Sequence, residues 1–338
     1  MLVDLRSDTF TKPTPGMLEA MSKAPVGDDV FEEDPSVNQL EQVVASLFGR
    51  EAALYCPNGT MSNQIAIKAH TNPGDEVICE RNSHVYQYEG GGIAFNAGCQ
   101  VNLVDGNRGR ITADQVRSAI NPDDVHKASS KLVCLENTCN RGGGSCYDIN
   151  DIAAIRKLCN AESLSLHLDG ARLFNAMVAK GENALEYGRL FHSISICLNK
   201  GLGCPIGSVL VGDRSFIRKA RRIRKVFGGG MRQAGYMAAT GIYALENHID
   251  RLAIDHLHAK KIGEELSKKD FCTHLFEVET NIVIFQTPGE EITSKIIQTL
   301  KEKDVLAISM GPTLVRFVFH LDVSEEMVDY TISTLKSL

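Results

Sequence analysis

Short apolar runs alternate with amphipathic stretches along most of this chain. Runs typical of buried strands lie at 75–80, 131–137, 163–169, 193–199 and 207–212. The intervals between them, such as 111–120 and 148–160, place apolar residues at three- and four-residue spacing, which predicts helices. This alternation predicts an α/β fold with a mainly parallel sheet that is covered by helices on both faces.

The two ends of the chain have different patterns. Residues 1–14 are mostly polar and predict an N-terminal arm rather than a core element, and 35–53 predicts a helix that Gly49 stops. A long helical stretch over about 233–268 precedes short apolar runs typical of strands, at 281–287, 305–310 and 314–321. We therefore expect three parts: an arm at 1–14, a large cofactor-binding domain at 15–245 and a small C-terminal α+β domain at 246–338.

Composition excludes several classes of partner. Of the 338 residues, 43% are hydrophobic and 23% are charged, and the net charge of −6 gives no general attraction to nucleic acid or acidic membranes. We expect no transmembrane helix and no signal peptide, because no apolar run is long enough. The ten cysteines lack the spacing of a zinc site, so we expect reduced thiols in a cytoplasmic protein and no metal.

Chemically active residues follow the predicted strands. Asp169 ends one strand, with Arg172 just after it, and Lys200 ends the next, 31 residues after Asp169. Ligands of parallel sheets bind at the carboxyl ends of the strands, so these side chains are expected in one crevice. Alone, an Asp-Gly pair usually makes a turn and a strand-end lysine is usually solvated. Together they suit pyridoxal phosphate, whose aldehyde binds a lysine and whose ring nitrogen pairs with an aspartate.

The segment 56–70 predicts a site for the phosphate of this cofactor. Gly59 and Thr60 lie in a turn, and a helix is expected to start near Met61. Exposed N–H groups at a helix start bind phosphate, although an Asn-Gly turn alone is a weak signal. His84 follows another predicted strand and can stack on a flat ring, but such a histidine is more often a hydrogen-bonded loop residue. His126 is a weaker candidate of the same kind.

The chain closely resembles the low-specificity threonine aldolases, which are pyridoxal-phosphate enzymes of fold type I with a seven-stranded sheet. The resemblance runs nearly end to end and is carried by LRSDT (5–9), GDDVFEEDPSVNQLE (27–41), SHVYQYEGGG (83–92), LENT (135–138), HLDGARLFNA (167–176), CLNKGLGCPIGSVLVG (197–212), GGGMRQAG (228–235) and RFVFHLD (316–322). It implies retro-aldol cleavage of a β-hydroxy-α-amino acid to glycine and an aldehyde.

The resemblance also implies a role for each candidate residue. It places Lys200 as the Schiff-base lysine, Asp169 as the partner of the ring nitrogen and His84 as the imidazole stacked on the ring. The phosphate cup is matched by Gly59, Thr60 and Met61, with Lys225 and Arg232 reaching in from a neighbouring subunit. Substrate contacts are matched by Arg172, which also lies near the cofactor's phenolic oxygen, and by Ser7, Arg316 and His126. The catalytic base is expected to be His126 or His84.

Two segments depart from the pattern of this family. The family usually has Tyr-Gly where this chain has Phe31-Glu32, and 140–145 is unusually rich in glycine, which predicts a mobile loop. Other fold-type-I activities, such as a β-eliminating lyase or an amino-acid racemase, would use the same cofactor residues. The basic stretch 218–225 allows a binding protein for RNA or phosphoinositide, but a solvated or subunit-facing helix is the favoured interpretation. Contacts between subunits imply a homo-oligomer, expected as a dimer of dimers.

Overall fold

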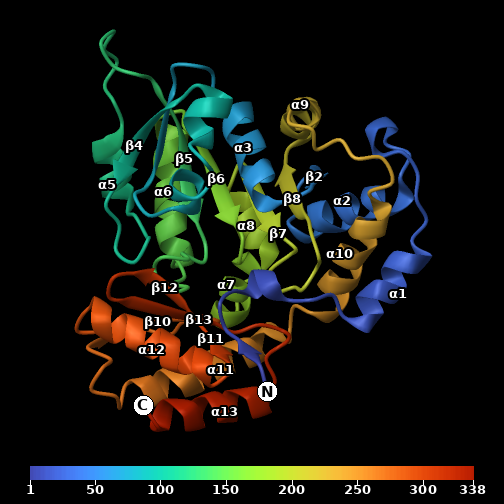
Figure 1. The fold of residues 1–338 in the computed structure, drawn as a ribbon. Helices are drawn as coiled ribbons and strands as arrows, with labels where there is room; N and C mark the ends of the chain where they lie inside the picture. Colours follow the sequence, from blue (N-terminus) through green and yellow to red (C-terminus); the bar gives the residue numbers. More distant parts are fainter.

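A computed structural model describes all residues 1–338, and a seven-stranded sheet forms its centre (Figure 1). The strands are β2 (Ala52–Cys56), β3 (Glu76–Glu80), β4 (Gln100–Val104), β5 (Ser130–Glu136), β6 (Ser165–Gly170), β7 (Ser193–Cys197) and β8 (Ser208–Gly212). They lie in the order β2-β8-β7-β6-β5-β3-β4, and β8 alone runs in the direction opposite to that of the other six strands. The predicted α/β fold with a mainly parallel sheet is confirmed. The sequence pattern missed β2 and β4.

Helices cover both faces of this sheet. The helices of the larger part of the chain are α1 (Pro15–Lys23), α2 (Pro35–Leu47), α3 (Gly59–His70), α4 (His84–Gln87), α5 (Ala113–Ala119), α6 (Ile149–Ala161), α7 (Leu173–Lys180), α8 (Ala184–Leu190), α9 (Arg214–Val226) and α10 (Gly235–Asn247). Alternate residues of one strand point to opposite faces. Leu54 of β2 thus packs in the cluster of α3 and α9, whereas the next residue, Tyr55, packs in the larger core with α2.

A second, antiparallel sheet follows near the C-terminus. Its order is β12 (Ile308–Gly311), β13 (Leu314–Val318), β10 (Ile282–Gln286) and β9 (His274–Leu275). The helices α11 (Leu252–Leu266), α12 (Glu290–Glu302) and α13 (Glu325–Lys336) accompany it. Figure 1 shows this part, in orange and red, beneath the end of the large sheet towards which β6 points. The expected boundary at 245 stays a prediction.

The N-terminal residues belong to the core of this second part. The short strand β1 (Val3–Asp4) pairs in parallel with β11 (Val305–Leu306), and the side chains of Val3 and Leu5 are fully buried among those of the small sheet. The expectation of an arm outside the core was therefore wrong for these residues. Their apolar side chains alternate with Asp4 and Arg6, a strand pattern too short to stand out in the sequence.

Two further expectations, both about helices, need correction. The helix predicted at 35–53 ends at Leu47, and Gly49 has a φ of +60° after it, so the stop was correct but Ala52 and Ala53 begin β2. The long helical stretch over 233–268 is two helices, α10 and α11. No helix in the structure is both long enough and apolar enough to span a membrane.

The glycine-rich segment 140–145 is not a mobile loop. Gly142, Gly143 and Gly144 are buried, and a bridge between Cys139 and Ser145 closes the segment. A Cβ on Gly144 would collide with the hydroxyl of Thr280, next to the second sheet. These glycines therefore allow a close approach of two backbones, which is the other common reason for glycine in a chain.

Candidate active site

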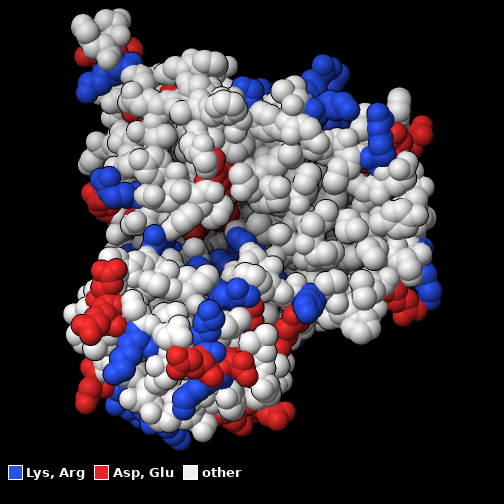
Figure 2. All heavy atoms as spheres, viewed as in Figure 1, with Lys and Arg blue, Asp and Glu red and all other residues white.

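The carboxyl ends of β5, β6 and β7 open onto a cavity between the two sheets. A cavity of about 130 Å³ is lined by Ser7, Thr9, His84, Glu136, Asn140, Asp169, Ala171, Arg172, Lys200 and Arg316. A wider hollow of about 370 Å³ shares His84, Asn140 and Arg316 with it and leads outward. Figure 2 shows Lys and Arg atoms gathered in the recess between the two parts of the molecule. The topology thus unites residues far apart in sequence.

Lys200 follows β7 in a tight turn. The N–H of Gly203 donates to the carbonyl of Lys200 at 2.8 Å, and Gly203 adopts a φ of +80°, which favours glycine. The amine of Lys200 has no hydrogen bond or ion pair within the chain, although it lines the cavity. It is therefore free to act on a ligand.

Asp169 is buried at the end of β6, and each oxygen of its carboxylate accepts a hydrogen bond from an N–H group. Its Oδ1 accepts from the N–H of Ala171 at 3.1 Å, and its Oδ2 accepts from Nδ2 of Asn63 at 3.0 Å. The same Nδ2 donates to Oε1 of Glu89 at 2.9 Å. One amide on α3 thus bridges two carboxylates beneath the cavity.

His84 lies beside these carboxylates at the start of α4. Its Nδ1 is 3.0 Å from Oε1 of Glu89, and the pKa of its imidazole is raised. Burial opposes protonation, but the hydrogen bond to Glu89 and the charge of Asp169 outweigh it. The backbone N–H of His84 donates to Glu136, whose own pKa is raised by burial and by the neighbouring Asp169. This cluster favours a histidine that exchanges protons near neutral pH.

Two arginines, Arg172 and Arg316, also line the cavity. Arg172 makes a buried bidentate pair with Asp8, at 2.7 Å for both Nε and Nη2. Burial opposes the ionisation of Asp8, but Arg172 and then Lys200 bring the pKa of its carboxyl down to about 2. Nη1 of Arg316 donates to Oδ1 of Asn140 at 2.9 Å.

Arg316 is incompletely paired. Its Nε is buried without a partner, and burial, followed by the charge of Arg172, lowers the pKa of the guanidinium to about 10. A buried cation of this kind is costly unless an anion joins it. The arrangement favours a carboxylate ligand in this cavity, because a guanidinium binds a carboxylate through two parallel hydrogen bonds.

The start of α3 supplies donors for a phosphate. Asn58 caps the helix by accepting from the N–H of Met61 at 2.9 Å, but no group of the chain accepts from the N–H of Gly59 or Thr60. The helix starts at Gly59, two residues before its predicted start. A Cβ on Gly59 would lie 2.5 Å from Sγ of Cys197, so only glycine lets α3 approach β7 this closely.

Three candidate residues lie apart from the cavity within one chain. His126 is on an exposed loop after α5, where its Nδ1 lies 2.8 Å from Asp124. Lys225 is exposed on α9, and Arg232 pairs with Asp28 at 2.9 Å. The structure does not bring these three to Lys200, so the substrate contact of His126 and the contacts of Lys225 and Arg232 across subunits stay predictions.

The departure at Phe31-Glu32 also lies outside the cavity. Glu32 has a φ of +61°, the left-handed conformation that favours glycine, and it lies 3.5 Å from Arg221. Phe31 is 68% exposed. The backbone therefore keeps the shape that a glycine would take there, although the residue has changed.

Sequence reasoning missed several residues of the site. Asp8, Asn63, Glu89 and Asn140 contact the predicted residues directly, but none of them ends a strand. The only available signals were positional, because Asp8 follows Ser7 and Asn63 lies one helical turn after Gly59.

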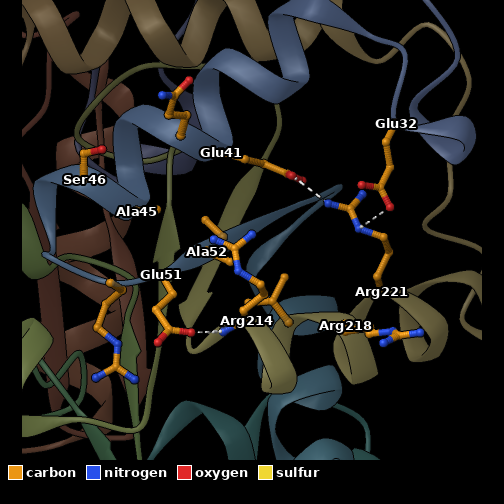
Figure 3. A pocket seen from close by; sticks show the side chains of 13 residues that line it. Glu32, Glu41, Ala45, Ser46, Glu51, Ala52, Arg214, Arg218 and Arg221 are labelled. Carbon is orange, nitrogen blue, oxygen red and sulfur yellow. Dashed lines mark hydrogen bonds and ion pairs between the residues drawn. The ribbon is translucent and has the colours of Figure 1, made fainter.

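A larger cavity lies elsewhere and has a different character. It measures about 650 Å³ between α2 and α9, and Figure 3 shows Arg221 directed at Glu41 and Glu32. The Arg221 Nη2 lies 2.7 Å from Glu41. Within it, Arg221 pairs with Glu41 and Glu32, and no lysine lines it. It also contains part of the basic stretch 218–225, in which Arg221 and Arg224 form ion pairs with acidic residues of the same chain.

Comparisons with known proteins concern the chain as a whole. The chain matches the model of the β-eliminating lyase family over residues 4–288. It is 43% identical to the low-specificity L-threonine aldolase of Escherichia coli (strain K12), over 97% of this chain and 96% of that protein. A solved threonine aldolase of Leishmania major has a TM-score of 0.86 at 20% identity, over 99% of both chains. A structure of SPT with PLP, at 14% identity over 99% of this chain and 87% of that one, has a TM-score of 0.77. At these lower identities the likeness concerns the fold.

Proposed function

This chain belongs to the β-eliminating lyase family and, within it, to the low-specificity L-threonine aldolases, and from this premise we propose that it cleaves L-threonine and L-allo-threonine to glycine and acetaldehyde. Other β-hydroxy-α-amino acids are substrates of the same class. The observation that carries the proposal is the convergence of Lys200, Asp169 and the incompletely paired Arg316 on one cavity. The enzyme is a lyase that uses pyridoxal phosphate.

The residues of the cavity fit this cofactor. The unpaired amine of Lys200 would hold its aldehyde carbon, and the buried carboxylate of Asp169 would pair with its ring nitrogen. The free N–H groups of Gly59 and Thr60, with Met61 behind them, would hold the phosphate, and His84 would lie against the ring. When bound, pyridoxal phosphate supplies the electron sink that accepts the charge left on Cα as the Cα–Cβ bond breaks.

The substrate carboxylate would bind to Arg316, with Arg172 and Ser7 beside it. Nη1 and Nη2 of Arg316 are held by Asn140 and by the carbonyl of Arg6, which fixes the plane of the guanidinium and leaves Nε for the carboxylate. Anchoring the carboxylate fixes the orientation of Cα, and a fixed orientation contributes to the rate because it avoids an entropic cost.

His84 is the residue of this chain best placed to take the proton from the β-hydroxyl group. Its Nδ1 is engaged by Glu89, which leaves Nε2 for the substrate. His84 also lines both the inner cavity and the outer hollow. Nε2 would accept the hydroxyl proton as the Cα–Cβ bond breaks, and the aldehyde would leave through the hollow. His126 remains the alternative base, contributed from a loop outside the cavity.

We also propose a homo-oligomer, arranged as a dimer of dimers, in the cytoplasm. One observation supports a site completed by a second subunit: neither of the candidates Lys225 and Arg232 lines the cavity of its own chain. All ten cysteines are free and nine of them are buried, which fits a reducing compartment.

The test is glycine release from the four threonine stereoisomers, with Lys200→Ala as the variant and Lys157→Ala, an exposed lysine on α6, as the matched control. We expect glycine and acetaldehyde from the two L isomers, and loss of both activity and visible cofactor absorbance in Lys200→Ala alone. Pyruvate and ammonia from serine, without cleavage of threonine, would instead indicate a β-eliminating lyase. Full activity of Lys200→Ala would refute the assignment.

A further inference from the structure

A chain of polar residues, all buried except the half-buried His70, runs from beneath Asp169 along the face of β6 and β7 that α3 covers. Beyond Asn63, Nε2 of His167 lies 3.1 Å from the Oδ1 of that asparagine. Nδ1 of His167 lies 2.8 Å from the hydroxyl of Ser193, and Nε2 of His70 lies 2.8 Å from the same hydroxyl. None of these residues lines the cavity, so the reaction proposed above leaves them without a role.

The donor and acceptor groups of these residues fix the direction of every hydrogen bond between them. Nδ2 of Asn63 faces two carboxylates, Asp169 and Glu89, so the amide must present its NH2 group to them and its oxygen to His167. His167 must then carry its proton on Nε2, and its Nδ1 must accept from the hydroxyl of Ser193. Ser193 in turn accepts from Nε2 of His70. The amide cannot flip without breaking bonds at both of its ends.

The two histidines have the protonation that this direction requires. Burial lowers the pKa of His167 to about 4 and lowers that of His70 as well, so both rings are neutral at neutral pH. A neutral ring has one donor and one acceptor nitrogen, as each link needs. All the polar atoms that the four residues direct at one another are therefore satisfied, which is the condition for a rigid buried network.

The bridge at Asn63 separates two carboxylates that would otherwise repel each other. Atoms of His84, Glu89 and Asp169 all lie within 4.8 Å of one another. Like charges at such distances repel each other. The amide donates to both carboxylates at once, and Gln64 adds a further donor to Glu89 at 2.6 Å. Asn63 and Gln64 lie on α3, about one helical turn after the N–H groups of Gly59 and Thr60.

We propose that Asn63 is a positioning residue, locked by the His167–Ser193–His70 chain, that holds Asp169 towards the cofactor's ring nitrogen and Glu89 towards His84. This inference rests on the proposed function for the identity of the cofactor. It assigns one amide to two tasks, because Asp169 serves the electron sink and His84 serves proton transfer. Asn63 lies on the same helix, α3, as the N–H groups of Gly59 and Thr60. The position of this helix therefore affects both tasks and the binding of the cofactor's phosphate together.

The test uses the holoenzyme variants Asn63→Leu and His167→Leu, with His167→Gln as the conservative rescue. We expect both leucine variants to bind pyridoxal phosphate about tenfold more weakly, since a buried carboxylate loses its donor. We also expect the pH midpoint of the visible cofactor band to move to higher pH, because a less firmly held Asp169 leaves the ring nitrogen less positive. His167→Gln keeps a donor for Asn63 and should restore both values.

The matched control is His256→Leu. His256 is also a buried histidine with a pKa of about 4, and it contacts an asparagine, Asn175, at 3.2 Å, but it has no link to Asp169. The cofactor affinity of this variant should stay within about twofold of the wild-type value, and the pH midpoint of its visible band should not shift. Wild-type values in both leucine variants would overturn the proposal.

A second measurement needs no variant. In magic-angle-spinning NMR of the protein labelled with 15N-histidine, His167 and His70 should be neutral at pH 7 with the proton on Nε2. A cationic His167, or one with its proton on Nδ1, would contradict the assigned directions and overturn the proposal even if a variant failed to fold. Neither this spectrum nor cofactor affinity depends on threonine cleavage, so a failure of the proposed substrate would be seen separately.

Discussion

At the scale of single residues, Arg316 marks the site because one of its buried hydrogen-bond donors has no partner within the chain. Its guanidinium is buried and donates to Asn140 and to the carbonyl of Arg6, yet its Nε has no partner. Burial and the charge of Arg172 lower its pKa to about 10, so the folded chain holds this cation at a cost. A substrate carboxylate bound to Arg316 would offset that cost, which ties the burial of this guanidinium to recognition of the substrate.

We expect Arg316→Leu to lower kcat/KM for L-threonine by about 100-fold, because a charge-assisted hydrogen-bond pair to the carboxylate is lost. Arg316→Lys should lose less, since a lysine keeps the charge but not the planar fork. Steady-state kinetics measures both values, and an unchanged visible cofactor band controls for the integrity of the site. Equal kcat/KM in the wild type and Arg316→Leu would place the carboxylate elsewhere.

At the scale of elements, α3 connects the two ends of the proposed cofactor site. Its first turn offers the N–H groups of Gly59 and Thr60, and its second turn offers Asn63 to Asp169. The helix is buried on nearly all sides, between the sheet and α9, so its register is fixed by packing rather than by an amphipathic pattern. At the start of the helix the packing is tight, because a Cβ added to Gly59 would lie 2.5 Å from Sγ of Cys197.

The substitution Gly59→Ala should lower the free energy of unfolding by about 1–3 kcal/mol, because the new methyl group would collide with Sγ of Cys197. The double variant Gly59→Ala/Cys197→Ala removes the obstructing thiol and should recover most of the loss. Urea unfolding of both variants and of Cys197→Ala alone checks this expectation. A double variant no more stable than Gly59→Ala would show that the strain lies in the backbone instead.

The N-terminal strand is the second element whose role depends on packing. Leu5→Ala should cost about 2–5 kcal/mol of stability, since Leu5 is fully buried in the core of the small sheet. Leu2, three residues earlier, is 59% exposed, and Leu2→Ala should change stability by no more than about 0.5 kcal/mol. Similar losses for the two variants in urea unfolding would contradict the burial of this segment.

At the scale of the whole molecule, the response to acid is a sum of opposing contributions. Burial lowers the pKa of His167, His192 and His256 to about 4, which makes the folded state less stable as the pH falls. Burial raises the pKa of Glu41 and Asp255, which has the opposite effect. The net acid dependence of stability therefore does not isolate any one group, whereas a comparison of variants does.

His167→Gln should isolate one of these contributions. The folded pKa of His167 lies below the ordinary value of 6.5, so the unfolded chain binds a proton that the folded chain excludes between pH 6.5 and about 4. The stability that the neutral ring contributes is thus present above pH 6.5 and lost as the pH falls. Relative to the variant, the wild type should lose about 1.4 kcal/mol per pH unit over this range. Urea unfolding at pH 7, 6 and 5 measures the difference, and parallel curves would contradict it.

The sequence by itself determined the class of fold, five strands of the large sheet, and the convergence of Asp169, Arg172 and Lys200. Periodicity reports which elements form, and the rule that parallel strands end at one edge brings their last residues together. Motif spacing also indicated the family. Such inferences succeed because each depends on local pattern or on neighbouring strands.

Only the tertiary structure decided the rest. The partners Asp8, Asn63 and Glu89 come from a terminus, a helix interior and a loop, and their contacts with the strand ends depend on long-range packing that no local pattern encodes. The same reason explains the buried N-terminal strand and the buried glycines at 142–144. It also explains why His126, which the motif suggested, lies on an exposed loop within one chain.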